Sequence, residues 1–531
     1  MTETASTWMQ RSRWAVVVGA IGLFLVLVGL FHVPGQGFSA LLVLGDHEPW
    51  ENLPELRDQD LFIQRYSPGY DAEHYVQLAM RPQVTDPALR VAVDNLPYRA
   101  RRILLSWSAW IFGGGDPERI VNVYALQGVV AWLVLAGLLL RWLPPTNWGN
   151  VGRWSAVMFT FGLCTSVRTA VVDGPAVVMI AGAVALIETG RRWLGAVILG
   201  LAGLVRETAV LAAVALLPHD GQRRSWLVAA AQGLLVVAPL GAWVLYLTAT
   251  LGTGEDVGTR NFSLPFGGYL WAWREAWRQL QLDLPWVGRS ASLLVLIALT
   301  VQALFFALRP RWSNVWWRIG ITYGALMAFL GWMVWEGQPG AAARVLLPMT
   351  LAFNLLVPRG RWWTAVLMAG NLAVIPSVLT LPNTIRDIHR IEGPRQWVQE
   401  APERWRVWYD QFWYSTEASR FGGTRWRWAS RSAGVVVYNP HDLPVRANVR
   451  FALASTEERE VTFSANGVVQ WRGPVDRLVR EGRADSLVLP PGYSRWVFAT
   501  EGSAEPVTPT DLRPLAFNLR DFRIEVLGSV E

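Results

Sequence analysis

The sequence contains no lysine, so all 48 of its basic residues are arginines. This could reflect a bias in the coding sequence, or a use for the guanidinium group, which stays charged and binds phosphate bidentately. The chain also has a single cysteine, Cys164, within an apolar run. One cysteine excludes an intramolecular disulfide and a cysteine-based metal site. Any soluble part of the chain must therefore be held together by packing.

Charged residues are scarce, at 17% of the chain against 52% hydrophobic residues, but they are unevenly distributed. Long apolar runs recur up to about Leu381, each near the ~20 residues that a helix needs to cross a bilayer. After Pro382 the charges are dense and no such run recurs. We expect a membrane domain over residues 1–381, with the lipid bilayer as its partner. The net charge of +7 fits basic loops that face anionic lipid, so it gives no reason to invoke nucleic acid.

The apolar runs predict about eleven membrane crossings. Arg11 and Arg13 precede the first run and place the N-terminus in the cytoplasm. Single spans are expected at residues 14–31, 120–140, 154–167, 175–188, 226–251, 291–307, 315–335, 345–357 and 362–381. This count places the C-terminus outside the membrane.

Three further segments fit this scheme differently. The segment 193–217 has basic residues on both flanks and Arg206-Glu207 at its centre. Two short helices that enter and return, with Arg206-Glu207 at the turn, satisfy both features; a single span with a buried ion pair is the alternative. The apolar stretch 103–112 is too short to span, and the loop 252–289 is rich in aromatic residues; each predicts an interfacial helix.

A polar stretch, residues 32–102, forms the predicted first external loop and contains an acidic, tyrosine-rich segment at residues 69–75. A carboxylate at the exit of a helix bundle can act as a general base toward a lipid-borne substrate. Asp71 is the candidate base. The alternative is that Asp71 caps a helix beginning at Ala72, a role that aspartate fills well.

The order of motifs resembles the GT-C glycosyltransferases, such as protein O-mannosyltransferases and the aminoarabinose transferase of lipid A. The resemblance covers about residues 14–381, and its motifs are short and degenerate. They are Tyr70-Asp71-Ala-Glu73-His-Tyr75, the run from Arg102 to Gly115, Arg119-Ile-Val-Asn122, Val172-Asp173-Gly-Pro175, Leu204-Val-Arg206-Glu207-Thr208 and Arg344-Val-Leu-Leu-Pro348. The chain departs from the pattern at Asp71-Ala-Glu73, because adjacent acids are commoner in the family. Either Asp71 or Glu73 is therefore a candidate for the catalytic acid.

The resemblance implies an inverting enzyme that moves a sugar from a polyprenyl-phosphate donor to a glycan, lipid or protein acceptor. Such a reaction needs a base for the acceptor hydroxyl and fixed cations for the leaving phosphate. The predicted catalytic residues are Asp71 and Glu73, the predicted phosphate ligands are Arg102, Arg206 and Arg344, and the predicted supporting residues are His74, Asp173 and Glu207. No metal ligands and no certain cofactor are predicted, although a divalent metal is left open.

Structural roles compete with several of these assignments. Arg344 could be a membrane-edge anchor that extends toward the interface. Arg206 and Glu207 could form an ion pair that only supports the fold. Asp173 could cap a helix that begins at Pro175, and His74 could be an interfacial histidine without a ligand.

The C-terminal part is expected to lie outside the membrane. Residues 382–428 predict an interfacial helical connector, because charged and aromatic residues alternate at helical spacing over 385–413. Residues 429–531 predict a jelly-roll-like β-sandwich, with strands at 434–438, 447–453, 459–464, 468–472, 485–489, 495–499 and 522–526 separated by turn signals such as Asn466-Gly467. The tryptophans here could be core or could stack on sugars, and either role fits the sequence.

The sequence as a whole favours a glycosyltransferase of a bacterial cytoplasmic membrane that works on the external face. The alternatives are a non-catalytic glycan- or lipid-binding membrane protein of cell-envelope polysaccharide assembly, and a transporter. The acidic external loop and the lack of an obvious inverted repeat stand against transport.

Overall fold

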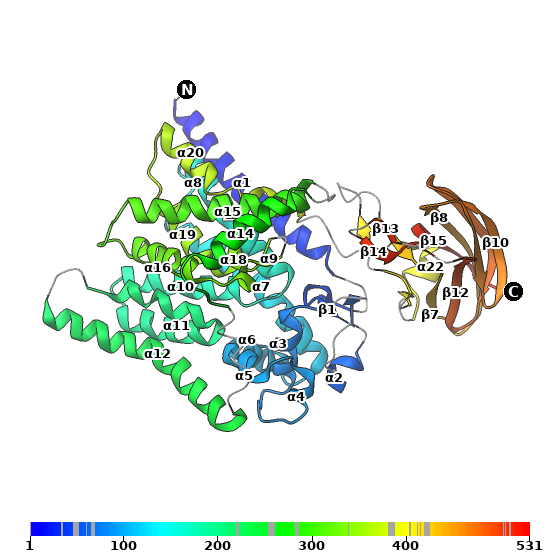
Figure 1. Ribbon diagram of the computed structural model, residues 1–531, viewed down its shortest axis with the longest axis horizontal. Helices are drawn as coiled ribbons and strands as arrows, with labels where there is room; N and C mark the ends of the chain where they lie inside the picture. The colour runs from blue at the N-terminus through cyan, green and yellow to red at the C-terminus, as the bar shows by residue number, and fades with distance from the viewer. Residues whose placement is uncertain are drawn as a thin grey trace. The chain divides into compact units, whose positions relative to one another are not determined.

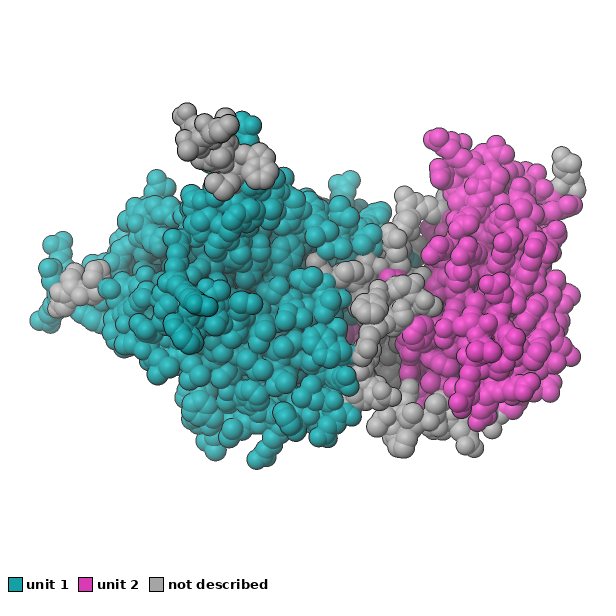
Figure 2. Space-filling model, turned by 90° about the horizontal axis from the view of Figure 1, so that it is seen from above, with its two compact units in different colours: residues 1–44, 49–62, 70–383 teal, residues 45–48, 63–69, 384–531 magenta. Residues whose placement is uncertain are grey.

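The structure is a computed structural model. It describes residues 2–32, 36–45, 52–59, 61–64, 69–218, 222–252, 261–281, 286–337, 339–380, 388–402, 405–410, 412–414, 416–418, 425–502, 504, 506–508 and 511–530. The chain forms two compact units, drawn in different colours in Figure 2. The first comprises residues 1–44, 49–62 and 70–383, and the second residues 45–48, 63–69 and 384–531.

The first unit is helical throughout most of its length (Figure 1). Its early helices are α1 (Thr2–Gly29), η1 (Ser39–Leu41), α2 (Pro54–Arg57), α3 (Asp71–Met80), α4 (Leu89–Ala92), α5 (Leu96–Arg99), η2 (Ala100–Arg102), α6 (Leu104–Gly113) and α7 (Pro117–Leu139). Its middle helices are α8 (Trp148–Met158), α9 (Phe161–Arg168), α10 (Asp173–Glu188), α11 (Arg192–Val205), η3 (Glu207–Leu216), α12 (Arg223–Leu251) and α14 (Gly267–Gln279). Its late helices are α15 (Trp286–Leu308), α16 (Val315–Phe329), α17 (Trp332–Trp335), α18 (Ala342–Val345), α19 (Leu347–Leu356), α20 (Arg361–Ala369) and α21 (Val374–Thr380).

Among the described residues, four helices are long and apolar enough to cross a membrane by length and composition: Gln10–Gly29, Pro117–Leu139, Arg223–Leu251 and Trp286–Leu308. The pair α20 and α21, bent by 51°, makes a fifth if it is counted as one span. Each of these five lies where the sequence predicts a span. The full count of about eleven crossings stays a prediction.

Several other expected spans are interrupted rather than continuous. The run 154–167 is divided between α8 and α9, and the run 315–335 between α16 and α17, whereas α19 covers most of the run 345–357 but is too short to span by itself. The segment 193–217 breaks at Arg206, whose extended backbone (φ −152°, ψ 125°) separates α11 from η3. The two pieces fold back on each other, because Nη2 of Arg192 at the start of α11 donates to the carbonyl oxygen of Leu216 at the end of η3. The predicted broken pair is thus present, and the single straight span is excluded.

The second unit contains two sheets that share one hydrophobic core. Its strands include β3 (His389–Glu392), β4 (Arg406–Tyr409), β5 (Glu417–Ala418), β6 (Arg425–Ala429), β7 (Ser432–Asn439), β8 (Val445–Ser455), β9 (Arg459–Ala465), β10 (Val468–Val475), β11 (Arg480–Leu489), β12 (Gly492–Thr500) and β15 (Phe517–Ser529). One sheet has the order β10-β9-β12-β7-β4 and the other β11-β8-β15-β6-β5. Strands β6 to β12 and β15 follow the strand order of a jelly roll, passing from one sheet to the other at each step except between β9 and β10, which are neighbours in one sheet. All seven predicted strands are observed.

The helical connector predicted for residues 382–428 is wrong for the residues that the structure describes there. This segment contains one short helix, α22 (Arg395–Val398), and otherwise strands that extend the sandwich. Strand β3 pairs with β15 and β4 pairs with β7. The aromatic residues that suggested a helical period are used in packing: Trp413 is completely buried between Tyr409, Phe498 and Phe517. Burial against the two sheets therefore outweighed the local helical pattern.

Candidate functional site

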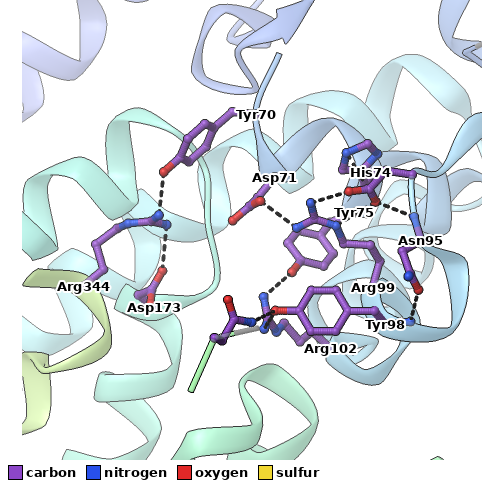
Figure 3. Close-up of polar contacts among 12 residues, drawn as sticks. Tyr70, Asp71, His74, Tyr75, Asn95, Tyr98, Arg99, Arg102, Asp173 and Arg344 are labelled. Atoms are coloured by element: carbon purple, nitrogen blue, oxygen red, sulfur yellow. Dashed lines mark hydrogen bonds and ion pairs between the residues drawn. The ribbon is translucent and has the colours of Figure 1, made fainter. Parts of the chain in front are cut away.

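The predicted base, Asp71, lies at the start of α3, the helix that contains most of the acidic segment 69–75. The helix starts at Asp71 itself, and its N-cap residue Tyr70 makes no side-chain capping bond. The Asp71 carboxylate instead accepts a hydrogen bond from Nη1 of Arg99 at 2.6 Å (Figure 3). The capping role considered for Asp71 is therefore not the one observed, and its side chain keeps 30% of its surface exposed.

The charge state of Asp71 is set by opposing effects. Burial raises the pKa of this carboxyl, but the positive charges of Arg99, Arg344 and Arg102 outweigh burial and hold the pKa well below its ordinary value. Asp71 is therefore a carboxylate and can accept a proton. A low pKa also reduces the driving force for that transfer, so its position must supply part of the catalysis.

Arg99 and Arg102 reach this region from α5 and η2, two short turns that follow each other directly. Asn95 starts α5, with its side-chain oxygen accepting from the backbone nitrogen of Tyr98 at 3.0 Å and with Pro97 in the first turn. Arg99 and Arg102 are three positions apart, so their side chains project from the same face of these helical turns. Arg99 also holds Asp94 through two contacts of 2.9 and 2.7 Å.

Arg102 is buried, and each of its three guanidinium nitrogens contacts protein. Nε donates to Oε2 of Glu207 at 2.8 Å, Nη1 to the Tyr75 hydroxyl at 2.7 Å and Nη2 to the Tyr98 hydroxyl at 2.9 Å. Burial lowers the pKa of Arg102, but Glu207 outweighs burial and raises it well above the ordinary value. This arginine ties α3 to the start of η3 in the bundle.

Arg206, Asp173 and Arg344 form a second group. Asp173 begins α10 and pairs through Oδ1 with Arg206 and through Oδ2 with Arg344, the latter at 3.2 Å. Nη2 of Arg344 also donates to the Tyr70 hydroxyl at 2.5 Å, as Figure 3 shows. Tyr70 and Arg344 lie 274 positions apart in the chain. The loop that carries Asp71 is thus directly bonded to the late part of the bundle.

These contacts decide between several of the structural alternatives. Arg206 and Glu207 do not pair with each other, since Arg206 contacts Asp173 and Glu207 contacts Arg102. Asp173 makes no capping bond, and α10 starts at Asp173 rather than at Pro175. Arg344 is buried on Asp173 and Tyr70, which excludes an extended membrane-edge anchor.

Glu73 and His74 point into the packed side of α3, and both are buried. The Nε2 atom of His74 lies 3.6 Å from Oδ1 of Asp94. Burial and the Arg99 charge lower the pKa of His74 to about 4, so the ring is neutral near pH 7. His74 is therefore a neutral, buried side chain next to Asp94. Of the two predicted catalytic acids, Asp71 is more accessible than Glu73, because only 1% of Glu73 is exposed.

No group of three or more His, Cys, Asp or Glu side chains is arranged to hold a metal ion within the part of the chain that the structure describes. Asp71, Asp173 and Glu207 contact arginines instead. The arrangement supplies carboxylates that are partly exposed, Asp71 among them, and a set of fixed cations, which suits proton abstraction next to an anionic leaving group.

Five residues of the site were not predicted as site residues from the sequence: Tyr70, Tyr75, Asp94, Tyr98 and Arg99. Arg99 carried a usable signal, because it precedes Arg102 by one helical turn and follows the Asn95-Leu-Pro97 helix start. Tyr70 was part of the recognised motif without a role. Asp94 also lies close to its partner in the sequence, because Arg99 follows it by five positions.

No family model matches the sequence, and no curated protein matches it. Among solved structures, the arabinosyltransferase EmbB from Mycobacterium smegmatis matches with a TM-score of 0.29 and 10% sequence identity, over 96% of this chain. The chain spans 64% of that enzyme's length. A TM-score this low does not show a shared fold, and an identity this low does not show a shared activity. The function therefore rests on the site itself.

Proposed function

We propose that the protein is an integral-membrane glycosyltransferase of the GT-C type. It transfers a sugar, with inversion, from a polyprenyl-phosphate donor to an acceptor on the external side of a bacterial cytoplasmic membrane. The observation that carries this proposal is the contact between Arg344 and Tyr70, because it joins the acidic loop motif to the arginines at the helix breaks.

In this reaction Asp71 is the base. It takes the proton of the acceptor hydroxyl as that oxygen attacks the anomeric carbon of the donor sugar. The bond from the sugar to the carrier phosphate breaks, and the phosphate leaves with additional negative charge. Arg206 and Arg344 stabilise that charge through their guanidinium donors, a role in which fixed cations contribute several kcal/mol.

The roles of the remaining predicted residues follow from their contacts. Arg102, also predicted to bind phosphate, has all three nitrogens engaged by protein atoms. We assign it, with Glu207, to holding α3 against the bundle. Glu73 and His74 are assigned to packing beneath α3, so Asp71 rather than Glu73 is the proposed base.

The test is sugar transfer by purified protein, with a panel of polyprenyl-phosphate-linked sugars as donors and isolated envelope glycans and lipids as acceptors. Release of polyprenyl phosphate is the readout. Asp71→Asn preserves size and removes the proton acceptor, so it should lower transfer by about 10²-fold or more while leaving thermal stability near that of the wild type.

Glu73→Gln is the matched control and should lower transfer less. Full transfer by Asp71→Asn together with abolished transfer by Glu73→Gln would show that the other acid is the base. If both variants and the wild type bind donor but none transfers sugar, the protein is a lipid- or glycan-binding protein instead.

A further inference from the structure

The side chain of Asp173 lies between two arginines that come from distant parts of the chain. Its Oδ1 pairs with Nη1 of Arg206 and its Oδ2 with Nη1 of Arg344. Only 1% of this side chain is exposed. Two guanidinium groups that each hold one oxygen of an anion are the arrangement with which arginines also grip a phosphate group. The carboxylate therefore occupies donors that a phosphate would use.

The charges around Asp173 explain why a carboxylate is needed between Arg206 and Arg344. Four arginines and four acids line the described site: Arg99, Arg102, Arg206, Arg344, Asp71, Asp94, Asp173 and Glu207. Their formal charges cancel. A buried cation without a partner is costly, so Arg206 and Arg344 require an anion when no ligand is bound. The same balance leaves no surplus positive charge for an incoming phosphate.

We propose that Asp173 is a positioning residue that stands in for the donor phosphate. It holds Arg206 and Arg344 in place in the empty site, and it limits the affinity for the phosphate that takes its position. This inference rests on the proposed function of these arginines.

A limited affinity for phosphate helps the reaction, because the phosphate product has to leave the site. The donor carries a phosphodiester, whereas the carrier released after transfer ends in a phosphate monoester with about −1.5 to −2 charges at pH 7. An arginine pair without a competing carboxylate would hold that product more tightly than the donor. Asp173 returns to the arginines as the product leaves, and so favours its release.

The experiment measures binding of a polyprenyl phosphate to the purified full-length protein in detergent. Asp173→Asn should bind it about tenfold more tightly than the wild type, which corresponds to the gain of one charge-assisted contact. It should also show stronger inhibition of sugar transfer by added polyprenyl phosphate. Uncharged polyprenol and inorganic phosphate at the same concentrations should not bind, which separates a lipid phosphate from its two parts.

Asp94→Asn is the matched control. It removes the same unit of negative charge from the cluster without freeing Arg206 or Arg344, so it should tighten binding by less than Asp173→Asn. If Asp173→Asn alone is too unstable to purify, the charge-balanced double variant Asp173→Asn/Arg206→Gln replaces it. The double variant should bind more tightly than Arg206→Gln alone, because the asparagine no longer competes with the phosphate for Arg344; equal or weaker binding would overturn the proposal.

The outcomes separate this inference from the proposed function. Equal or weaker binding by Asp173→Asn than by the wild type, with weakened binding by Arg344→Leu, would overturn the role of Asp173 and leave the glycosyltransferase standing. If the wild type binds polyprenyl phosphate no better than Arg344→Leu does, the phosphate site itself is wrong. A purely structural role for Asp173 would not tighten binding in any variant.

Discussion

The Asp71 carboxylate owes its charge state mainly to neighbouring arginines, and Arg99 is the most influential of them. Burial raises the pKa of Asp71, and the Arg99, Arg344 and Arg102 charges lower it further than burial raises it. Because the folded pKa lies below the ordinary value, the base form is present throughout the neutral range and is lost only as the pH falls through that lowered pKa. The wild-type enzyme should therefore show no acid limb from Asp71 near neutrality.

Arg99→Gln should change that pH profile. Without the guanidinium, burial raises the pKa of Asp71 with less opposition, so the base form is lost at a higher pH. We expect kcat/KM for sugar transfer to begin to fall at a higher pH in the variant than in the wild type as the solution is made more acidic.

Two controls accompany this measurement. Arg99→Lys keeps a positive charge next to Asp71 and should keep the level profile. Arg101→Gln removes a neighbouring arginine that is not among the charges acting on Asp71, and it should also leave the profile level. An unchanged profile in Arg99→Gln would show that Asp71 is not the group whose ionisation transfer requires.

At the scale of elements, the position of Arg344 depends on a close approach between α9 and α18. A Cβ added at Gly162 of α9 would lie 2.1 Å from the carbonyl oxygen of Ala343, the residue before Arg344. That oxygen belongs to the backbone and cannot rotate away. Only glycine at position 162 allows this contact, which places Arg344 against Asp173 and Tyr70.

Gly162→Ala should therefore push α18 away from α9. We expect a loss of about 1–3 kcal/mol of stability, as in overpacked cores, and a weaker hold of Arg344 on Tyr70. Thermal unfolding in detergent, followed by tryptophan fluorescence, together with sugar transfer, measures both effects.

Gly182→Ala is the control for this prediction. Gly182 lies within α10, and nothing stands within 4 Å of a Cβ added there. The Gly182→Ala variant should be as stable as the wild type or slightly more stable, because alanine favours a helix. Equal stability of the two alanine variants would contradict the proposed contact between α9 and α18.

At the scale of the whole molecule, the arginine-rich short loops predict which side of the membrane each end of the chain occupies. Arg11 and Arg13 precede the first span, and cytoplasmic loops carry an excess of basic residues. We expect the N-terminus inside and the second unit outside. A reporter that is active only outside the membrane, fused after Glu531, should give signal, and a cytoplasmic reporter at the same place should not. The reverse result would contradict the count of crossings.

The sequence predicted elements well where one local signal dominated. Alternating apolar residues and turn signals located seven strands of the second unit, and unbroken apolar runs located the long helices α7, α12 and α15. The charged pair Arg206-Glu207 inside an apolar segment located the break between α11 and η3. The same approach failed for the described residues between 388 and 413, where aromatic residues at helical spacing pack against the two sheets instead of forming a helix.

The sequence by itself determined the chemical inventory of the site: a carboxylate at position 71 in an acidic loop, arginines at positions 102, 206 and 344, and an aspartate at position 173. Residue type and placement near span ends carry that information. Only the tertiary structure decided most of the partners, because the ion pairs other than Arg99–Asp94 join segments that are far apart in the chain. In the structure Asp71 pairs with Arg99, Glu207 pairs with Arg102, and Asp173 pairs with both Arg206 and Arg344. Those pairings follow from the requirement that every buried charge meets an opposite one, which a linear pattern cannot assign among four arginines and four acids.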